Sequence, residues 1–514
     1  MRRKLRFINH VLFLPYHRYC LLITNYYLNI MKYAPTIGLE VHAELKTATK
    51  MFCGCPNDPD EKHPNTNVCP VCLGHPGTLP IPNKKALAHM ITIGFALGGK
   101  INDIFAFDRK NYFYPDLPKG YQITQLEHPV VLGGTIDVSA RFGSPRMIKI
   151  HHVHLEEDAG KLVHADDGKS SLVDFNRGGV PLMELVSDPD MHSAKEAVAF
   201  AKELQLILRY LGVSDADLDR GQMRADANIS ISATDALGTK VEIKNLNSFR
   251  AIEDAVNYEI LRQTDLLENG ERIKQETRGW DDIKQKTVSQ RSKEEAQDYR
   301  YFPEPDIPPQ DPSAFDVAEL ERGVPELPNA KRKRFREQLG LSDEQANILV
   351  EDRSEAEYFE EAISEWEEDL QHDLDKERVS LLFNYLNTDL KGLMANAGIS
   401  FADLKVTQEN FADLMDLLFQ KTISSRTGKD LLARMFESGA DPRVLVKEEG
   451  LVQVSGEEEL LKVIKTVIRE NPKAVEDYKK GKMNALQFMV GKSMAALKGR
   501  GNPAVLRDLL QKEL

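Results

Sequence analysis

A proline-dense segment, residues 299–312, divides this chain into two parts with different sequence patterns. Before it, short runs with β-branched and alternating apolar residues, such as 36–45, 227–233 and 239–246, predict strands. Proline and glycine recur between these runs and indicate turns. After the segment, Leu, Ala, Glu and Lys dominate, which predicts helices. The sequence therefore predicts an α+β domain with an antiparallel sheet, followed by all-helical structure.

Chain length indicates how many domains to expect. The 514 residues are enough for about three domains. Ser193 and Glu196 form a capping-box pattern at the start of an apolar helix, and Gly212 is placed to end that helix. The expected parts are an N-terminal extension outside the fold at 1–35, an α+β domain at 36–325, a helical domain at 326–440 and a small helical tail domain at 441–514.

The first thirty residues differ from the rest of the chain. Four of residues 1–6 are basic, and no acidic residue occurs before Glu40. A secretory signal needs an unbroken apolar core and a small-residue cleavage site, and neither is present. A mitochondrial transit peptide fits the basic character but not the absence of serine from 1–30. We interpret Met31 as the natural start and expect a bacterial cytoplasmic protein rather than one of the mitochondrial matrix.

Four of the five cysteines lie close together in the sequence. Cys53 and Cys55 form one pair, and Cys69 and Cys72 follow after thirteen residues. Two such pairs on Gly- or Pro-containing turns can present four thiolates tetrahedrally to Zn²⁺. The alternative is four free thiols on loops. Because four thiolates fill every position of the metal, a zinc ion here would be structural rather than catalytic.

Acidic residues and one histidine suggest a second kind of metal site. Glu40 and His42 are two apart in a predicted strand, so their side chains face the same side and suit a divalent cation. The commoner alternative for such a pair is a histidine that is hydrogen-bonded within the protein and a glutamate that is exposed to solvent. In 154–161, three successive carboxylates either face solvent or share a cation. No glycine-rich phosphate loop is present, so ATP would need isolated Lys or Arg side chains and Mg²⁺.

Other motifs place charged and amide groups beside strands. Residues 108–123 interleave basic side chains with aromatic rings, which suits stacking on a nucleotide but also an aromatic strand with charged edges. Residues 174–179, 223–228 and 242–247 each place a charge and an asparagine next to an apolar run. Asparagine is a poor strand former, so its repeated use suggests specific hydrogen bonds, although each motif alone also fits a turn.

Taken together, these segments resemble the B subunit of the glutamyl-tRNA(Gln)/aspartyl-tRNA(Asn) amidotransferase. The resemblance runs from about Thr36 to Leu514. Seven motifs in the order of that family carry it: IGLEVHAEL (37–45), FDRKNYFYPDLPKGYQI (107–123), HLEEDAGK (154–161), DFNRGGVPLMELVSDPD (174–190), MRADANISI (223–231), EIKNLNSF (242–249) and DYRYFPEPDIPP (298–309).

The resemblance implies a catalytic domain shaped like a cradle and a specific reaction. The B subunit uses ATP to phosphorylate the side-chain carboxylate of misacylated Glu-tRNA(Gln), Asp-tRNA(Asn) or both. Ammonia, which an amidase A subunit releases from glutamine, then reaches this site through a tunnel and displaces phosphate. A small C subunit completes the heterotrimer, and no membrane is involved. The activity implied is that of a glutamine-dependent amidoligase.

The resemblance also implies roles for particular residues. His42 and Glu157 would bind Mg²⁺, with Glu40 in or beside that shell. Lys110 and Tyr112 would lie at the tunnel mouth, where Glu40 or Glu157 would take the proton of an ammonium ion. The residues expected to contribute to the ATP and substrate pocket are Arg177, Asp226 and Lys244. Family members with and without the four cysteines support a structural zinc.

The C-terminal tail domain is basic within an acidic chain. The whole sequence carries a net charge of −13, whereas 471–514 holds nine Lys or Arg and four Asp or Glu. A basic helical surface suits the tRNA backbone. Lysines added for solubility are the alternative. The residues that we expect to contact tRNA are Lys482, Lys492, Lys498 and Arg500.

Two other functions compete with amidation. A non-enzymatic, zinc-containing tRNA-binding protein would explain the cysteines and the basic tail, but not the Glu40 and His42 pair together with the carboxylate run. A zinc hydrolase needs an open metal position, and the spacing of the four cysteines argues against it.

Overall fold

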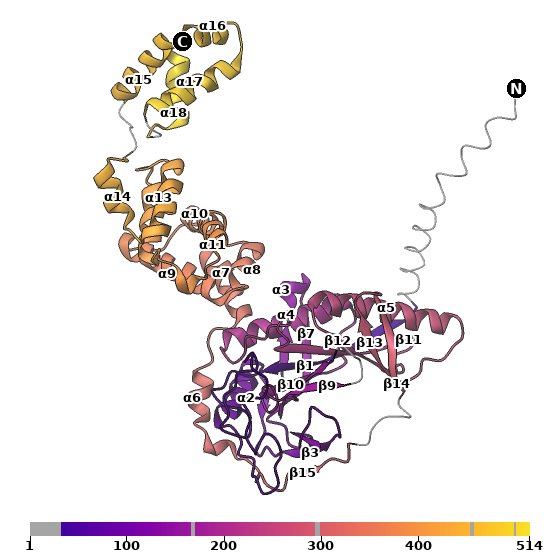
Figure 1. The fold of residues 1–514 in the computed structure, drawn as a ribbon. Helices are drawn as coiled ribbons and strands as arrows, with labels where there is room; N and C mark the ends of the chain where they lie inside the picture. Colours follow the sequence, from indigo (N-terminus) through magenta and orange to yellow (C-terminus); the bar gives the residue numbers. More distant parts are fainter. Residues whose placement is uncertain (1–31, 166–169, 293–298, 453–456, 498–499) are drawn as a thin grey trace, which may run out of the picture. The chain divides into compact units, whose positions relative to one another are not determined.

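The computed structural model describes residues 32–165, 170–292, 299–452, 457–497 and 500–514. Two compact units divide between Asn329 and Ala330. The first unit is built on a sheet with flanking helices, and the second is helical (Figure 1), so the α+β prediction is confirmed. The finer domain boundaries stay predictions, and the N-terminal extension lies outside the described residues as far as Met31.

The main sheet of the described residues has ten strands and is antiparallel except where β12 pairs with β13. Its order is β14-β13-β12-β11-β1-β10-β7-β5-β2, with β6 also paired to β7. The strands span Ala34–Glu44 (β1), Lys100–Ile101 (β2), Val131–Leu132 (β5), Thr135–Asp137 (β6), Met147–Glu157 (β7), Pro181–Ser187 (β10), Met223–Ser232 (β11), Val241–Leu246 (β12), Glu276–Asp281 (β13) and Lys286–Ser292 (β14). The three strands predicted from alternation correspond to β1, β11 and β12 and are confirmed.

Two smaller sheets complete the first unit. One contains β15 (Phe302–Pro303), β3 (Asp108–Asn111) and β4 (Tyr121–Thr124), and the other pairs β8 (Lys161–His164) with β9 (Ser171–Asp174). The side-chain amide of Gln122 in β4 donates to the backbone carbonyl of Glu157 at 2.8 Å. This contact holds the three-stranded sheet against the end of β7.

Helices α4 (Ala194–Tyr210) and α5 (Phe249–Glu268) pack on the sheet (Figure 1). The Ser193 hydroxyl accepts a hydrogen bond from the Glu196 N–H at 3.2 Å, as predicted. The second hydrogen bond of a capping box, from the Ser193 N–H to the Glu196 side chain, is replaced, because the Glu196 carboxylate accepts from the His192 N–H and from Arg146. Gly212 follows the helix with φ +65°, which confirms the predicted end. The remaining helices of this unit are α2 (Lys84–Ala96), α3 (Ser139–Phe142), η2 (Pro312–Ala314) and α6 (Val317–Arg322).

Alternation along β1 explains why polar groups gather on one face of the sheet. The side chains of Ile37, Leu39, Val41 and Ala43 are fully buried in the core, which includes residues of α4. Because successive side chains of a strand point to opposite faces, the even-numbered residues of β1 lie on the other face. Burial of the apolar set therefore fixes the direction of the polar set, which includes Glu40 and His42.

The second unit is helical throughout its described elements. They are α7 (Pro328–Leu339), α8 (Asp343–Val350), α9 (Arg353–Leu370), α10 (Lys376–Asn384), the π-helix η3 (Tyr385–Leu390), α11 (Lys391–Ala397), η4 (Phe401–Asp403), α12 (Gln408–Phe419), α13 (Ser425–Ser438), α14 (Pro442–Glu449), α15 (Glu457–Glu470), α16 (Pro472–Lys479), α17 (Met483–Ala496) and α18 (Pro503–Glu513). Helices α15 to α18 share a separate apolar core around Leu460, Met489 and Leu506. Among the described residues, no helix combines the length and apolar composition needed to cross a membrane.

Candidate functional site

The antiparallel register of three central strands brings one histidine and two glutamates together. His42 of β1 faces Glu184 of β10, and Glu156 of β7 lies one strand further along. The His42 Nε2 atom is 3.1 Å from Glu184 Oε2 and 3.7 Å from Glu156 Oε1. One ligand atom from each of these residues lies within 4.8 Å of the others. We call His42, Glu156 and Glu184 the central acidic group.

Charges within this group shift the pKa values strongly. Burial by itself raises the pKa of Glu184, but the imidazoles of His154 and His42 outweigh it and hold this pKa well below its ordinary value. Burial lowers the pKa of His154, but Glu184 and Glu156 raise it to about 9. The His154 Nε2 atom lies 3.3 Å from Glu184 Oε2. Buried carboxylates are thus ionised and concentrated at one point, which is the condition for holding a divalent cation.

Glu157 does not join His42, contrary to the expected pair of Mg²⁺ ligands. It is ion-paired with Lys119, and its Oε1 atom accepts the backbone N–H of Ile123 at 3.0 Å. Glu156 and Glu157 are neighbours at the end of β7, and neighbouring strand residues face opposite ways. Glu156 therefore takes the position beside His42, while Glu157 lines a separate cavity of about 210 Å³.

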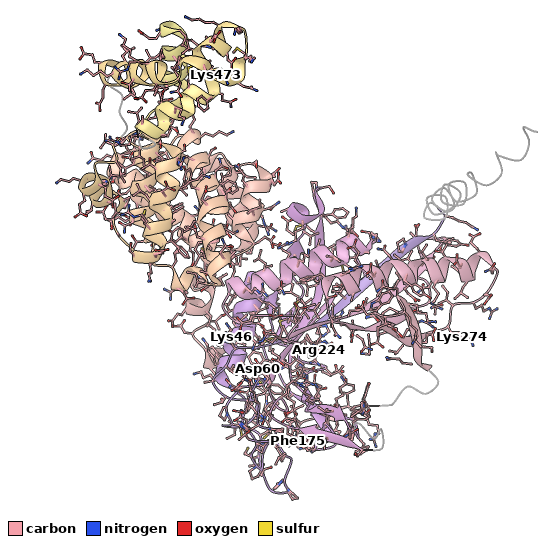
Figure 2. All side chains as sticks on the ribbon, turned by 45° about the horizontal axis from the view of Figure 1, so that its top comes forward. Lys46, Asp60, Phe175, Arg224, Lys274 and Lys473 are labelled. Carbon is pink, nitrogen blue, oxygen red and sulfur yellow. The ribbon has the colours of Figure 1, made fainter. Side chains whose placement is uncertain are left out.

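A cavity of about 350 Å³ opens beside the central acidic group. His42 and Glu156 line this cavity. Three cationic side chains also line it, those of Lys110, Arg224 and Lys244. Arg224 lies opposite His42 in the register of β1 and β11, and Figure 2 labels it at the sheet. Predicted residues that line the same cavity are His42, Lys110, Tyr112, Asp226 and Lys244. The cavity thus combines anionic ligands for a metal with fixed positive charge.

Glu40 belongs to a second acidic group on the same face of the sheet. Ligand atoms of Glu40, Asp226 and Glu242 lie within 4.8 Å of one another. The Lys244 Nζ atom sits among them, 2.8 Å from Asp226 and 2.9 Å from Glu242. Burial raises the pKa of Glu40, and Asn228 donates to its Oε1 atom at 2.7 Å. The ammonium of Lys244 therefore already neutralises part of this group.

Lys110 of β3 and Tyr112, which follows the end of β3 at Asn111, both line the cavity. Burial lowers the pKa of Lys110, but Glu156 and other anionic neighbours raise it to about 12. The Lys110 Nζ atom lies 5.2 Å from the centre of the Tyr299 ring. The Tyr112 ring stacks on Tyr114 with centroids 5.6 Å apart. Lys110 thus remains a cation near the central acidic group.

Arg177 and Arg224 both act on the buried carboxylate of Asp158. Arg224 donates to Asp158 Oδ1 at 2.9 Å, whereas Arg177 donates to the backbone carbonyls of Ala159 and Gly160 at 3.1 and 3.2 Å. Arg177 is not among the described residues that line the cavity. Its contacts hold the turn after β7, so of the two arginines Arg224 is the one placed to meet a ligand.

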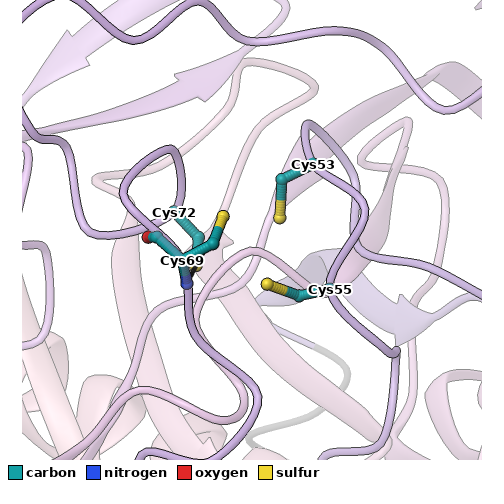
Figure 3. A group of neighbouring side chains, drawn as sticks. All are labelled: Cys53, Cys55, Cys69 and Cys72. Atoms are coloured by element: carbon teal, nitrogen blue, oxygen red, sulfur yellow. Dashed lines mark hydrogen bonds between the residues drawn. The ribbon is translucent and has the colours of Figure 1, made fainter.

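The four clustered cysteines face one another between two loops (Figure 3). Their sulfur atoms all lie within 4.8 Å of one another. A hydrogen bond from Cys53 is the largest cause that lowers the pKa of the Cys72 thiol, to about 5, while the same bond and burial raise the pKa of Cys53. Four convergent thiols are the donor set of a tetrahedral Zn²⁺ site. Cys53 and Cys72 also line the cavity that contains Glu157.

The predicted tRNA-contacting residues lie on the helical tail. Lys482 pairs with Asp477 at 2.9 Å, and the Lys492 Nζ atom lies 5.5 Å from the centre of the Phe488 ring. Arg500 donates to the backbone carbonyl of Gly450 at 3.1 Å. Lys498 lies outside the described residues. These contacts leave Lys482 and Lys492 on the surface of α17 and the turn before it.

Sequence reasoning missed Glu156, Glu184 and Arg224 as members of the site. One signal was available for Glu184, because it is the single charged residue in the apolar strand PLMELVS (181–187). A lone charge within such a run is costly unless it has a partner in the fold. For Glu156, the choice between adjacent glutamates required the direction of β7.

The geometry defines a class of site, namely one in which carboxylates and a histidine with the donor set of a divalent cation lie beside fixed positive charge on a mostly antiparallel sheet. Comparison with known proteins identifies the family. Residues 35–314 match the GatB/GatE catalytic domain, and residues 358–514 match the GatB domain. The chain is 46% identical over 488 residues to the B subunit of the aspartyl/glutamyl-tRNA(Asn/Gln) amidotransferase of Thermomicrobium roseum, covering 94% of this chain and 99% of the relative.

Other B subunits of the same name give similar values. The identity is 44% over 490 residues with the protein of Thermotoga sp. (strain RQ2), covering 94% of this chain and 99% of the relative. The identity with the B subunit of Persephonella marina is 44% over 486 residues, covering 94% of this chain and 100% of the relative. The chain therefore belongs to the family of aspartyl/glutamyl-tRNA(Asn/Gln) amidotransferase B subunits, which confirms the resemblance seen in its motifs.

Proposed function

We propose that this chain activates the side-chain carboxylate of glutamate on tRNA(Gln), aspartate on tRNA(Asn), or both, with ATP, and then amidates it with glutamine-derived ammonia. The observation that carries the proposal is the 350 Å³ cavity in which His42 and Glu156 of the central acidic group lie together with the cationic side chains of Lys110, Arg224 and Lys244. The names of the relatives support amidation, and none favours a non-enzymatic tRNA-binding protein. The chain would be the B subunit of a glutamine-dependent ligase of the bacterial cytoplasm, with an amidase A and a small C subunit.

Mg²⁺ fits the central acidic group because two ionised carboxylates and an imidazole converge there. The proposed ligands are His42, Glu156 and Glu184, with Glu156 in place of Glu157. When bound, Mg²⁺ neutralises phosphate charge and polarises the phosphoryl group. The structural Zn²⁺ ligands that we propose are Cys53, Cys55, Cys69 and Cys72.

Fixed cations explain how this chain handles phosphate without a glycine-rich loop. Phosphoryl transfer depends mostly on positioning and electrostatic stabilisation. Lys110 and Lys244 keep their charge because anionic neighbours raise their pKa values. Arg224 is oriented by Asp158, which accepts from it at 2.9 Å. We assign these three side chains to the anionic groups of ATP and of the activated carboxylate, and we keep Asp226 as the partner that orients Lys244.

The ammonia that attacks the activated carboxylate must first lose the proton of an ammonium ion. Lys110, with a pKa of about 12, does not accept that proton at neutral pH. Burial raises the pKa of Glu40, which moves this carboxylate toward the range of a general base. We therefore propose Glu40 rather than Glu157 as the acceptor, with Lys110 and Tyr112 at the entry of ammonia.

The test is to co-express the chain with candidate A and C subunits and assay the complex on both misacylated tRNAs. We expect ADP formation that depends on Glu-tRNA(Gln) or Asp-tRNA(Asn), together with formation of the amidated product when glutamine is present. Tight tRNA binding without ATP turnover on either substrate would instead favour the non-enzymatic tRNA-binding protein.

Replacing Lys482 and Lys492 by glutamine should weaken tRNA binding by the complex. Each lost phosphate contact lowers the slope of log affinity against log salt by about 0.9. We expect a slope smaller by about 1 to 2, with an unchanged KM for ATP, as measured by filter binding at several salt concentrations. Replacing Lys274 by glutamine in the first unit is the control. An unchanged salt slope would show that the tail lysines serve only solubility.

A further inference from the structure

A run of four neighbouring tyrosines passes along the cavity of the first unit. It comprises Tyr112, Tyr114, Tyr299 and Tyr301, and we call it the tyrosine row. In space the rings follow one another in the order Tyr114, Tyr112, Tyr299, Tyr301. The centroids of neighbouring rings are 5.6 Å apart for Tyr112 and Tyr114, 6.2 Å for Tyr112 and Tyr299, and 6.1 Å for Tyr299 and Tyr301. Tyr112 and Tyr299 line the cavity, so the row and the cavity are continuous.

Pairing between two distant segments builds this row. Strand β15 pairs with β3, and the Asn111 N–H donates to the Tyr299 carbonyl at 2.9 Å just beyond the paired residues. The row therefore joins two motifs that lie almost 190 residues apart. Tyr301 is at one end of the row and is 37% exposed, while the two middle rings, Tyr112 and Tyr299, are the ones that line the cavity. Tyr114 is at the other, outer end of the row, with 49% of its surface exposed.

We propose that the tyrosine row binds the unpaired 3′ end of the aminoacyl-tRNA, with the terminal nucleobase stacked on Tyr114. The planes of Tyr112 and Tyr114 differ by only 19°, so a base on the outer face of Tyr114 continues an existing stack. Aromatic rings on which bases stack are the usual means of binding single-stranded nucleic acid. The proposal rests on the proposed function and adds where its RNA substrate is held.

The chemistry of the substrate explains why the base should lie there. The reacting carboxylate belongs to an amino acid esterified to the terminal ribose, so only a few bonds separate it from the terminal base. If the carboxylate reaches the central acidic group, the base must stop near the rim of the cavity, where Tyr114 lies.

The exposed outer end favours RNA over the adenine of ATP. Small ligands are mostly enclosed by their sites, whereas the end of a polynucleotide must enter from solvent. Tyr114 and Phe113 are 49% and 74% exposed. Phe113 lies between Tyr112 and Tyr114 in sequence, but its ring instead borders Gly120, where a Cβ atom added to the glycine would lie 3.1 Å from the ring. Phe113 therefore provides a control from the same segment.

The test is the substitution Tyr114→Leu in the assembled complex. We expect the KM for the aminoacyl-tRNA to rise about 5- to 100-fold while the KM for ATP stays within about twofold. Tyr114→Trp should retain the original KM because it keeps a ring for stacking, and Phe113→Leu should leave both KM values unchanged. A rise in the KM for ATP alone would assign the row to adenine, and unchanged KM values for both substrates would contradict the proposal.

A second measurement does not depend on catalysis. A tRNA whose terminal adenine is replaced by 2-aminopurine should lose fluorescence on binding to the unaltered complex, because stacking quenches this base. Tyr114→Leu should restore most of that fluorescence, and Phe113→Leu should not. Absence of quenching by the unaltered complex would overturn the proposal even if a variant failed to fold. If the complex did not amidate at all, the proposed function would fail while the quenching still tested the row.

Discussion

Glu184→Gln should reduce tRNA-dependent ADP formation by about 100- to 1000-fold. This carboxylate lies 3.1 Å from His42 and 3.3 Å from His154, and those imidazoles keep it ionised. Glutamine keeps the shape of the side chain but removes the negative charge that holds the cation. Because the effect acts on carboxylate activation, it should appear in ADP formation measured with ammonium chloride as well as with glutamine. Mg²⁺ titration of the rate should show a weaker apparent affinity.

Glu157→Gln is the matched control, since it changes an adjacent member of the same acidic run. Glu157 pairs with Lys119 on the other face of β7 and both side chains are buried, so this variant should lower the unfolding midpoint of the complex while the Mg²⁺ dependence of ADP formation stays unchanged. Glu156→Gln should resemble Glu184→Gln. If Glu157→Gln impaired Mg²⁺ dependence and Glu156→Gln did not, the ligand set inferred from the structure would be wrong.

Changing Cys53, Cys55, Cys69 and Cys72 together to serine should remove one equivalent of zinc per chain. Zinc at 100 to 1000 times its Kd stabilises the folded chain by about 2.7 to 4.1 kcal/mol. The unfolding midpoint should therefore fall by about 5 to 15 °C, as measured by calorimetry on the assembled complex. Below that midpoint, amidation should continue, because four thiolates leave no open position for substrate on the metal.

His63→Gln is the control for this experiment, since His63 lies between the two cysteine pairs and its side chain is 86% exposed. It should keep the zinc content and the midpoint of the unaltered chain. Loss of amidation in the four-serine variant at a temperature where it remains folded would contradict a purely structural role. An unaltered chain without zinc would show that the cluster exists as free thiols.

Much of the fold could be predicted because local pattern and tertiary burial agree. Alternation in β1 and the Ser193 cap of α4 are both satisfied in the folded chain. The order of strands could not be read in this way, since β1 pairs with β10 and β11 rather than with its neighbours in sequence. Sequence spacing carries no information about which distant strands meet.

The candidate site could likewise be predicted only in part from the sequence. The family motifs assigned His42 and Lys110 to one site, and both residues line one cavity, while their roles in Mg²⁺ binding and ammonia entry stay predictions. Glu157 was misplaced because a run of adjacent carboxylates does not show which member faces which side. Glu184 was missed because its partners come from β1 and β7, far away in the sequence. Residues of a site built across strands become visible only when the register is known.

The positions of Glu156 and Glu157 have a mechanical consequence. The two carboxylates project from opposite faces of the same short stretch of β7, one toward the cation group and the other toward Lys119 and the cysteine loops. Among the described residues, the two cavities have no lining residue in common, so the backbone of β7 at these two positions is what they share. A change of this backbone would act on both carboxylates at once.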